Sequence, residues 1–267
     1  MSIARKHFEK VSAAQAAETA KDKGETVISG NAADTMLARL RGHEVILKNI
    51  KSTRAKIIKK REFLPEYEGY IDGIISSGTG LQDNVVTTIM VWRFDISDLV
   101  GGLEIAAYVL EHDLKLPERF SRNAATMVLE VIADLCEATK PEGDQAKNFI
   151  DALGEAFELT DGMDMPDEVR AKSYKQLGFL QEADHPQAAL DSLNAAFEFD
   201  PKSGVKTKIG QLEKLLKPAD PPKDTKPAPA SDLKTKETKT PGTKAKNTTP
   251  KKTTPKPTET IPSPKRR

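Results

Sequence analysis

The chain has 267 residues, enough for one or two domains with a hydrophobic core of their own. Its single cysteine, Cys136, excludes an intrachain disulfide, and no stretch reaches the roughly 20 apolar residues that a membrane span needs. The N-terminal sequence also lacks the apolar run of a signal peptide. Composition therefore predicts a soluble protein of the reducing cytoplasm.

The formal net charge of +1 hides a segregation of charge along the chain. Residues 36–62 carry nine basic and two acidic side chains, residues 63–216 carry 13 and 28, and residues 217–267 carry 14 and five. Two basic segments thus flank an acidic body. This pattern indicates an anionic partner for the basic segments, with nucleic acid as the first interpretation and an anionic membrane as the alternative.

Residues 1–216 are predicted to form an all-α, multi-helix body. Apolar residues recur at three- and four-residue spacing, prolines fall at the breaks, and no alternating strand pattern is present. The predicted helices are 3–20, 34–62, 66–76, 81–93, 97–112, 120–138, 144–159, 167–182, 186–198 and 204–216.

The predicted helix 34–62 carries a narrow apolar stripe, formed by Leu40, Leu47, Ile50 and Ile57. Such a stripe suits packing against one partner helix, including one from another subunit. Within residues 36–62, only Glu44 and Glu62 balance nine cations, so the sequence predicts phosphate contact rather than an ordinary solvated face. The predicted DNA-contacting residues are Arg39, Arg41, Lys48, Lys51, Arg54, Lys56, Lys59, Lys60 and Arg61.

The middle of the chain offers little that indicates catalysis. Gly78 is predicted to end a helix, and Trp92 and Phe94 have the spacing of core residues, with base stacking as the alternative. No phosphate-binding loop of an ATPase and no zinc-site pattern occurs.

The carboxylates that a Mg²⁺-dependent nuclease would need are weak candidates, because each is explained as well by helix capping or by solvent exposure. They are Asp83, at the start of a helix, Asp95, which is an alternative to Ser97 as the cap of the next helix, Asp98 and Glu104.

Residues 173–201 resemble a tetratricopeptide repeat, with 204–216 as its capping helix. Leu177 and Gly178 open the first helix pattern, and Ala189, Ala196 and Pro201 follow at the spacing of the repeat. A single repeat is typical of a structural helical hairpin, since several stacked repeats are needed to form a groove.

Residues 217–267 differ from the rest of the chain. Eleven of the 17 prolines lie here among Lys and Thr, and the segment has no aromatic residue. It is predicted to be a disordered basic tail, because it cannot bury enough apolar surface to fold. Its last residues, Lys265, Arg266 and Arg267, are predicted DNA contacts.

Three strings of the sequence are similar to the small terminase subunits of P2-like tailed phages. They are KKREFLP (59–65), QDNVVTTIMVWRFDISDLVGGLEIAAYVL (82–110) and DMPDEVRAK (164–172). The resemblance implies a protein of the host cell cytoplasm that recognises the cohesive-end site of phage DNA and recruits the ATP-hydrolysing large subunit. The complex then cuts the DNA and packages it into the procapsid. Family members generally form rings, which implies a homo-oligomer.

The same family is described as the terminase endonuclease subunit, so the resemblance leaves the enzymatic role open. If the chain were itself the nuclease, Mg²⁺ would be its cofactor; otherwise no cofactor is predicted. A helical protein–protein adaptor without DNA affinity is a further alternative. The predicted organisation is a basic N-terminal region at 1–62, an acidic helical body at 63–216 with a repeat-like hairpin at 173–216, and the tail at 217–267.

Overall fold

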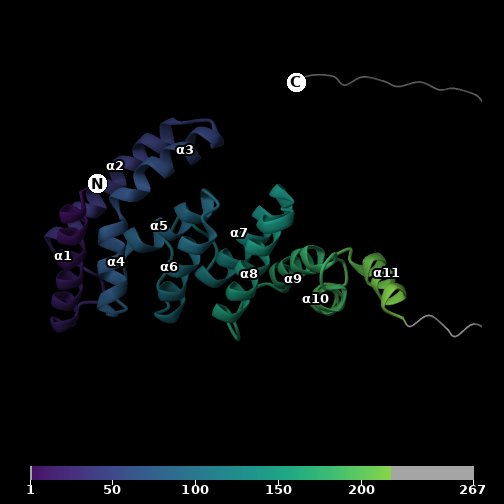
Figure 1. The fold of residues 1–267 in the computed structure, drawn as a ribbon. Coiled ribbons are helices and arrows are strands. Elements are labelled where there is room, and N and C mark those ends of the chain that lie inside the picture. The colour runs from purple at the N-terminus through teal and green to yellow at the C-terminus, as the bar shows by residue number, and fades with distance from the viewer. Residues whose placement is uncertain (1, 218–267) are drawn as a thin grey trace, which may run out of the picture. The chain divides into compact units, whose positions relative to one another are not determined.

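A computed structural model describes residues 2–217, and within this range the chain is helical and contains no strand (Figure 1). The all-α prediction is therefore confirmed for the described residues. Their elements are α1 (Ile3–Asp22), α2 (Asn31–Asn49), α3 (Thr53–Phe63), the 3₁₀ helix η1 (Leu64–Glu66), α4 (Glu68–Ser77), α5 (Asn84–Asp95), α6 (Leu99–Glu111), α7 (Ala124–Thr139), α8 (Gly143–Leu159), α9 (Asp167–Gln181), α10 (Pro186–Phe199) and α11 (Lys206–Leu216).

Side-chain caps fix where several of these helices begin. Asp83 accepts hydrogen bonds from the backbone of the first turn of α5, Asp98 does the same for α6, and Asn123 for α7. The suggestion that Asp95 or Ser97 caps the helix after α5 was wrong, because Asp98 holds that position. Gly78 ends α4 in the left-handed conformation, with φ of 56°, as predicted.

The predicted single helix 34–62 is in fact two helices, α2 and α3. Ile50 and Ser52 are extended, and the hydroxyl of Ser52 accepts a hydrogen bond from the backbone N–H of Ala55, which starts a new helix. Neither glycine nor proline marks the break in the sequence. The spacing of apolar residues alone therefore predicted one continuous helix where the structure has two.

Helices α1 and α4 approach each other at the level of the backbone. A Cβ atom built on Gly73 would lie 2.3 Å from the carbonyl oxygen of Lys10 and 2.8 Å from the Cβ of Ala13. A Cβ atom built on Gly69, one turn earlier, would lie 2.6 Å from the carbonyl oxygen of Lys6. The two glycines therefore allow a contact that no larger residue could make.

One hydrophobic core extends from α1 to α9, and a smaller one joins α10 and α11. Trp92 and Phe94 lie in the main core, 4% and 0% exposed, so the prediction that they are core residues is confirmed. Residues 2–217 belong to one compact unit. The predicted domain boundary between residues 62 and 63 is not tested, and the predicted tail, with Lys265, Arg266 and Arg267, lies outside the described residues.

Candidate nucleic-acid interface

Helices α2 and α3 form a hairpin, residues 31–63, which carries the nine predicted DNA contacts (Figure 1). The chain folds back at the turn 50–52, so that His43 of α2 stacks on Phe63 at the end of α3. Their ring centroids are 3.7 Å apart and the rings are nearly parallel, at 4°. The turn between the helices is therefore the tip of the hairpin, and the stacked pair lies near its base.

Polar contacts fasten the base of this hairpin to the rest of the fold. The Nδ1 atom of His43 lies 2.8 Å from the hydroxyl of Tyr67, and Arg39 donates to the carbonyl oxygen of Glu66 at 2.9 Å. Arg39 also lies 3.6 Å from a carboxylate oxygen of Glu9 on α1. Tyr67 meets Trp92 of α5 edge to face. The hairpin base is thus joined to α1, η1 and α5.

Four of the nine predicted DNA contacts take part in contacts within the chain. Arg39 is bound to Glu9 and Glu66 as above, and its side chain is only 18% exposed. The other three lie on the last two turns of α3. Lys59 pairs with Glu62, Lys60 pairs with Asp95 of α5 and lies over the Trp92 ring, and Arg61 donates to the carbonyl oxygen of Ile96.

The other five cations have no carboxylate partner within residues 2–217. They gather on the second half of α2, the turn and the first half of α3: Arg41, Lys48, Lys51, Arg54 and Lys56. All except the half-buried Lys56 are exposed. Glu44, which could have balanced them, is bound at 2.8 Å to Arg119. The tip of the hairpin therefore keeps its positive charge.

The apolar stripe predicted to pack against one partner helix, including one from another subunit, is largely buried inside the chain. Leu40 and Leu47 are buried in the main core, and Ile50 packs against it. The break at Ser52 divides the stripe between two helices, and the part on α2 packs within the chain. The exposed aliphatic residues of the hairpin are Val45, Ile46 and Ile58. Oligomerisation stays a prediction.

Among the weak nuclease candidates, Asp83 is buried and has a structural role. Its carboxylate accepts hydrogen bonds from the hydroxyl of Tyr70 at 2.6 Å and from the backbone N–H groups of Val85 and Val86 at 2.6 and 3.1 Å. Burial raises the pKa of Asp83, and these three hydrogen bonds oppose that rise because they stabilise the charged form. The arrangement joins α4 to the start of α5.

The remaining three candidates lie at separate places. Asp95 pairs with Lys60, Asp98 pairs with Arg93 while capping α6, and Glu104 is exposed. Within residues 2–217, no three His, Cys, Asp or Glu side chains come together in a way that could hold a metal ion. Their catalytic assignment stays a prediction that the geometry does not test.

The stability of the hairpin base is expected to depend on pH through His43. Burial lowers the pKa of His43 below its ordinary value of 6.5, an effect that Glu66 opposes and Arg39 reinforces. Between pH 6.5 and the lower folded pKa, the unfolded chain binds more protons than the folded chain, so the free energy of unfolding should fall as the pH falls. Denaturant unfolding between about pH 7.5 and 5.5 measures this slope.

The variant His43→Phe keeps an aromatic ring against Phe63 and removes the titrating group, so its slope should be smaller than that of the wild type. Equal slopes for the two proteins would show that His43 does not carry the effect.

Comparison with known proteins identifies the class of molecule to which this hairpin and its helical body belong. The family model of the phage small terminase subunit matches residues 37–168, from α2 to the start of α9. The chain therefore belongs to the phage small terminase subunit family and takes part in packaging phage DNA. Membership implies viral DNA and a large terminase subunit as partners. No helix within residues 2–217 is long and apolar enough to span a bilayer.

Two curated relatives place the chain more specifically, among the small terminase subunits of P2-like phages. The chain is 36% identical over 222 residues to the "Terminase, endonuclease subunit" of Escherichia phage P2, which covers 83% of this chain and 88% of that protein. It is 22% identical over 175 residues to the "Probable terminase, endonuclease subunit" of Haemophilus phage HP1, covering 59% and 61%. No solved structure matches the chain.

Proposed function

We propose that this terminase small subunit binds the cohesive-end packaging site of the phage DNA in the host cytoplasm, recruits the ATPase large subunit, and takes part in cutting the DNA and packaging it into the procapsid. The observation that carries the DNA-binding part is the group of five cations on the α2–α3 hairpin, of which Lys48, Lys51, Arg54 and Lys56 surround its tip and Arg41 lies nearer its base. None of the five has a carboxylate partner within residues 2–217. Four of them are exposed and so are accessible to a phosphate backbone.

The distribution of the other charges supports this placement. Residues 63–216 carry 28 acidic against 13 basic side chains, so the helical body repels a duplex. Contacts with DNA are thereby restricted to the hairpin tip and to the basic residues 217–267, including Lys265, Arg266 and Arg267. Lys59, Lys60 and Arg61 have a smaller role in this proposal than the sequence suggested. Lys60 and Arg61 join α3 to the end of α5, and Lys59 is paired with Glu62 within α3.

The hairpin of α9 and α10, with α11 as its cap, is the part of the body that we propose to be tetratricopeptide-like. Support comes from the close crossing of the two helices. A Cβ on Gly178 would lie 2.7 Å from the side chain of Leu193 and 3.1 Å from the carbonyl oxygen of Ala189. Small residues at a crossing point are what the repeat pattern requires.

A second candidate function is that the chain itself cuts DNA with Mg²⁺, which the names of both relatives favour. The two candidates differ in what the isolated chain does. The first predicts that the purified protein binds cohesive-end DNA alone and that specific cleavage requires Mg²⁺ together with the large subunit.

The experiment is therefore binding and cleavage of cohesive-end DNA, each measured with and without the large subunit. Cleavage by this chain alone would establish the endonuclease and displace the first candidate. Failure to bind the DNA at low salt, either alone or with the large subunit, would overturn both candidates and leave a protein–protein adaptor.

A further inference from the structure

One face of α2 is exposed along the second half of the helix. Arg41, Val45 and Asn49 follow one another at a spacing of four residues, so their side chains form a single stripe. All three are exposed, and Val45 is 60% exposed although it is apolar. The buried residues Leu40 and Leu47 belong to the opposite face of the helix. The stripe therefore points away from the core of the protein.

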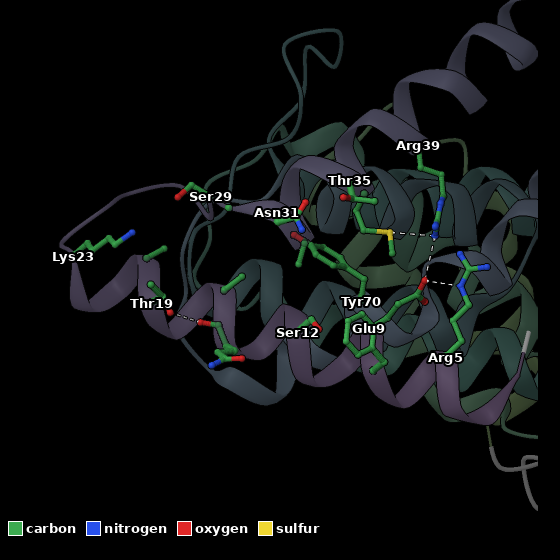
Figure 2. A pocket seen from close by; sticks show the side chains of 17 residues that line it. Arg5, Glu9, Ser12, Thr19, Lys23, Ser29, Asn31, Thr35, Arg39 and Tyr70 are labelled. Carbon is green, nitrogen blue, oxygen red and sulfur yellow. Dashed lines mark hydrogen bonds and ion pairs between the residues drawn. The ribbon is translucent and has the colours of Figure 1, made fainter.

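The polar side chains of this stripe have no partner within residues 2–217. Arg41 makes no ion pair, and the side-chain amide of Asn49 makes no hydrogen bond. Arg39, only two residues before Arg41, differs from it: Figure 2 shows Arg39 turned toward Glu9 of α1, where it lies 3.6 Å from a carboxylate oxygen. The exposed face carries one carboxylate, that of Asp34, about two turns before Arg41. The stripe is thus free to bind an external ligand.

The three residue types are those that read base edges in the major groove of a duplex. Arginine donates two hydrogen bonds to O6 and N7 of guanine, asparagine pairs with N6 and N7 of adenine, and an apolar side chain contacts the methyl group of thymine. The major groove is about 12 Å wide and admits one α-helix. From Arg41 to Asn49 the stripe is about 12 Å long, which corresponds to roughly three or four base pairs.

The neighbouring cations are placed to hold α2 in such a groove. Lys48 lies on α2 beside the stripe, and Lys51 and Arg54 follow it at the turn and at the start of α3. All three are exposed. Phosphate contacts fix the position of a protein on a duplex, whereas contacts with base edges select the sequence. The hairpin therefore carries the residues for both kinds of contact side by side.

We propose that the second half of α2 enters the major groove of the packaging site and that Arg41, Val45 and Asn49 read its base edges. The inference rests on the proposed binding of cohesive-end DNA and assigns sequence recognition to particular residues. Lys48 and its neighbours at the turn supply affinity for any duplex, while the stripe supplies the preference for the packaging site.

Asn49→Ala tests the proposal because it changes no charge. The affinity of the purified full-length protein is measured for cohesive-end DNA and for a duplex of the same length with a scrambled sequence, at one salt concentration. The variant should lose affinity for cohesive-end DNA about tenfold or more and keep its affinity for the scrambled duplex. Asn148→Ala, at an exposed asparagine of α8, should change neither. Lys48→Gln should weaken both about equally.

Val45 is tested by changing the DNA as well as the protein. Replacing thymine with uracil throughout the cohesive-end DNA removes the methyl groups that an apolar side chain contacts. This replacement should weaken binding of the wild type several-fold and leave the affinity of Val45→Ala unchanged. An equal effect of uracil on the two proteins would contradict the role of Val45.

Thermal unfolding of each variant shows whether the fold is intact. An unchanged preference of Asn49→Ala for cohesive-end DNA would overturn the assignment to α2 while leaving DNA binding by the protein standing. An equal loss of affinity for both duplexes would make Asn49 a contact to the DNA backbone, which also overturns it. If the wild-type protein itself does not prefer cohesive-end DNA, the proposed recognition of the packaging site fails, and the inference fails with it.

Discussion

Replacing Gly73 with alanine is expected to lower the free energy of unfolding by about 3 kcal/mol, the upper range for overpacking where two helices meet closely. The added Cβ would lie 2.3 Å from the carbonyl oxygen of Lys10, which belongs to the backbone of α1 and cannot rotate away. Helix α1 would have to move off α4, and Ala13 and Ala17, which are fully buried, would pack less tightly. Denaturant unfolding of the two proteins measures the difference.

A matched control separates this clash from the intrinsic effect of the substitution. Gly154 also lies inside a helix, α8, but a Cβ at that position meets no atom within 4 Å. Gly154→Ala should stabilise the protein by up to about 1 kcal/mol, because alanine is the better helix former. If both variants were stabilised, the close approach of α1 and α4 would be disproved.

Neutralising the hairpin tip, with Lys48→Gln, Lys51→Gln and Arg54→Gln together, is expected to weaken DNA binding at least tenfold, since about three phosphates are then no longer neutralised by the protein. The slope of log affinity against log salt should become shallower by about 2.7, at roughly 0.9 for each of these phosphates. The fold should be unaffected, because the side chains of these three exposed residues make no ion pair or hydrogen bond within residues 2–217. DNA affinity measured across a salt series gives both quantities.

A control variant removes the same number of positive charges at a site far from the hairpin tip in the sequence. Lys202, Lys206 and Lys214 are exposed, lie in or near α11, and have no ion pair within the described residues. Replacing all three with glutamine should leave the salt slope nearly unchanged. An equal weakening of DNA binding in the two triple variants would mean that net charge alone, and not the hairpin tip, governs binding.

Helix content and the core were largely predictable from the sequence, because they depend on local periodicity. The spacing of apolar residues around Trp92 predicted a buried helix, and α5 is one. The break between α2 and α3 was missed, because a serine N-cap is a weaker signal than proline or glycine. The stack of His43 on Phe63, which joins residues 20 apart, is an interaction that no local pattern shows.

The sequence predicted the candidate DNA-binding site only as a set of nine basic residues, without showing which of them are paired inside the chain. In the sequence, Lys60 and Lys51 look equivalent. They differ in the structure because Lys60 pairs with Asp95, 35 residues further along, while Lys51 lies in the exposed turn at the tip of the hairpin. The same limit applies to Asp83, whose hydrogen bond with Tyr70 depends on how α4 and α5 are placed.

The position of Trp92 makes the protein its own spectroscopic probe. It is the only tryptophan of the chain, and its ring touches Tyr67 edge to face and lies beneath the ammonium group of Lys60 at the base of the hairpin. Its emission therefore responds to one place in the molecule. Movement of α3, on loading of the hairpin tip or on early loosening of the fold, becomes visible as a change in intrinsic fluorescence without any attached dye.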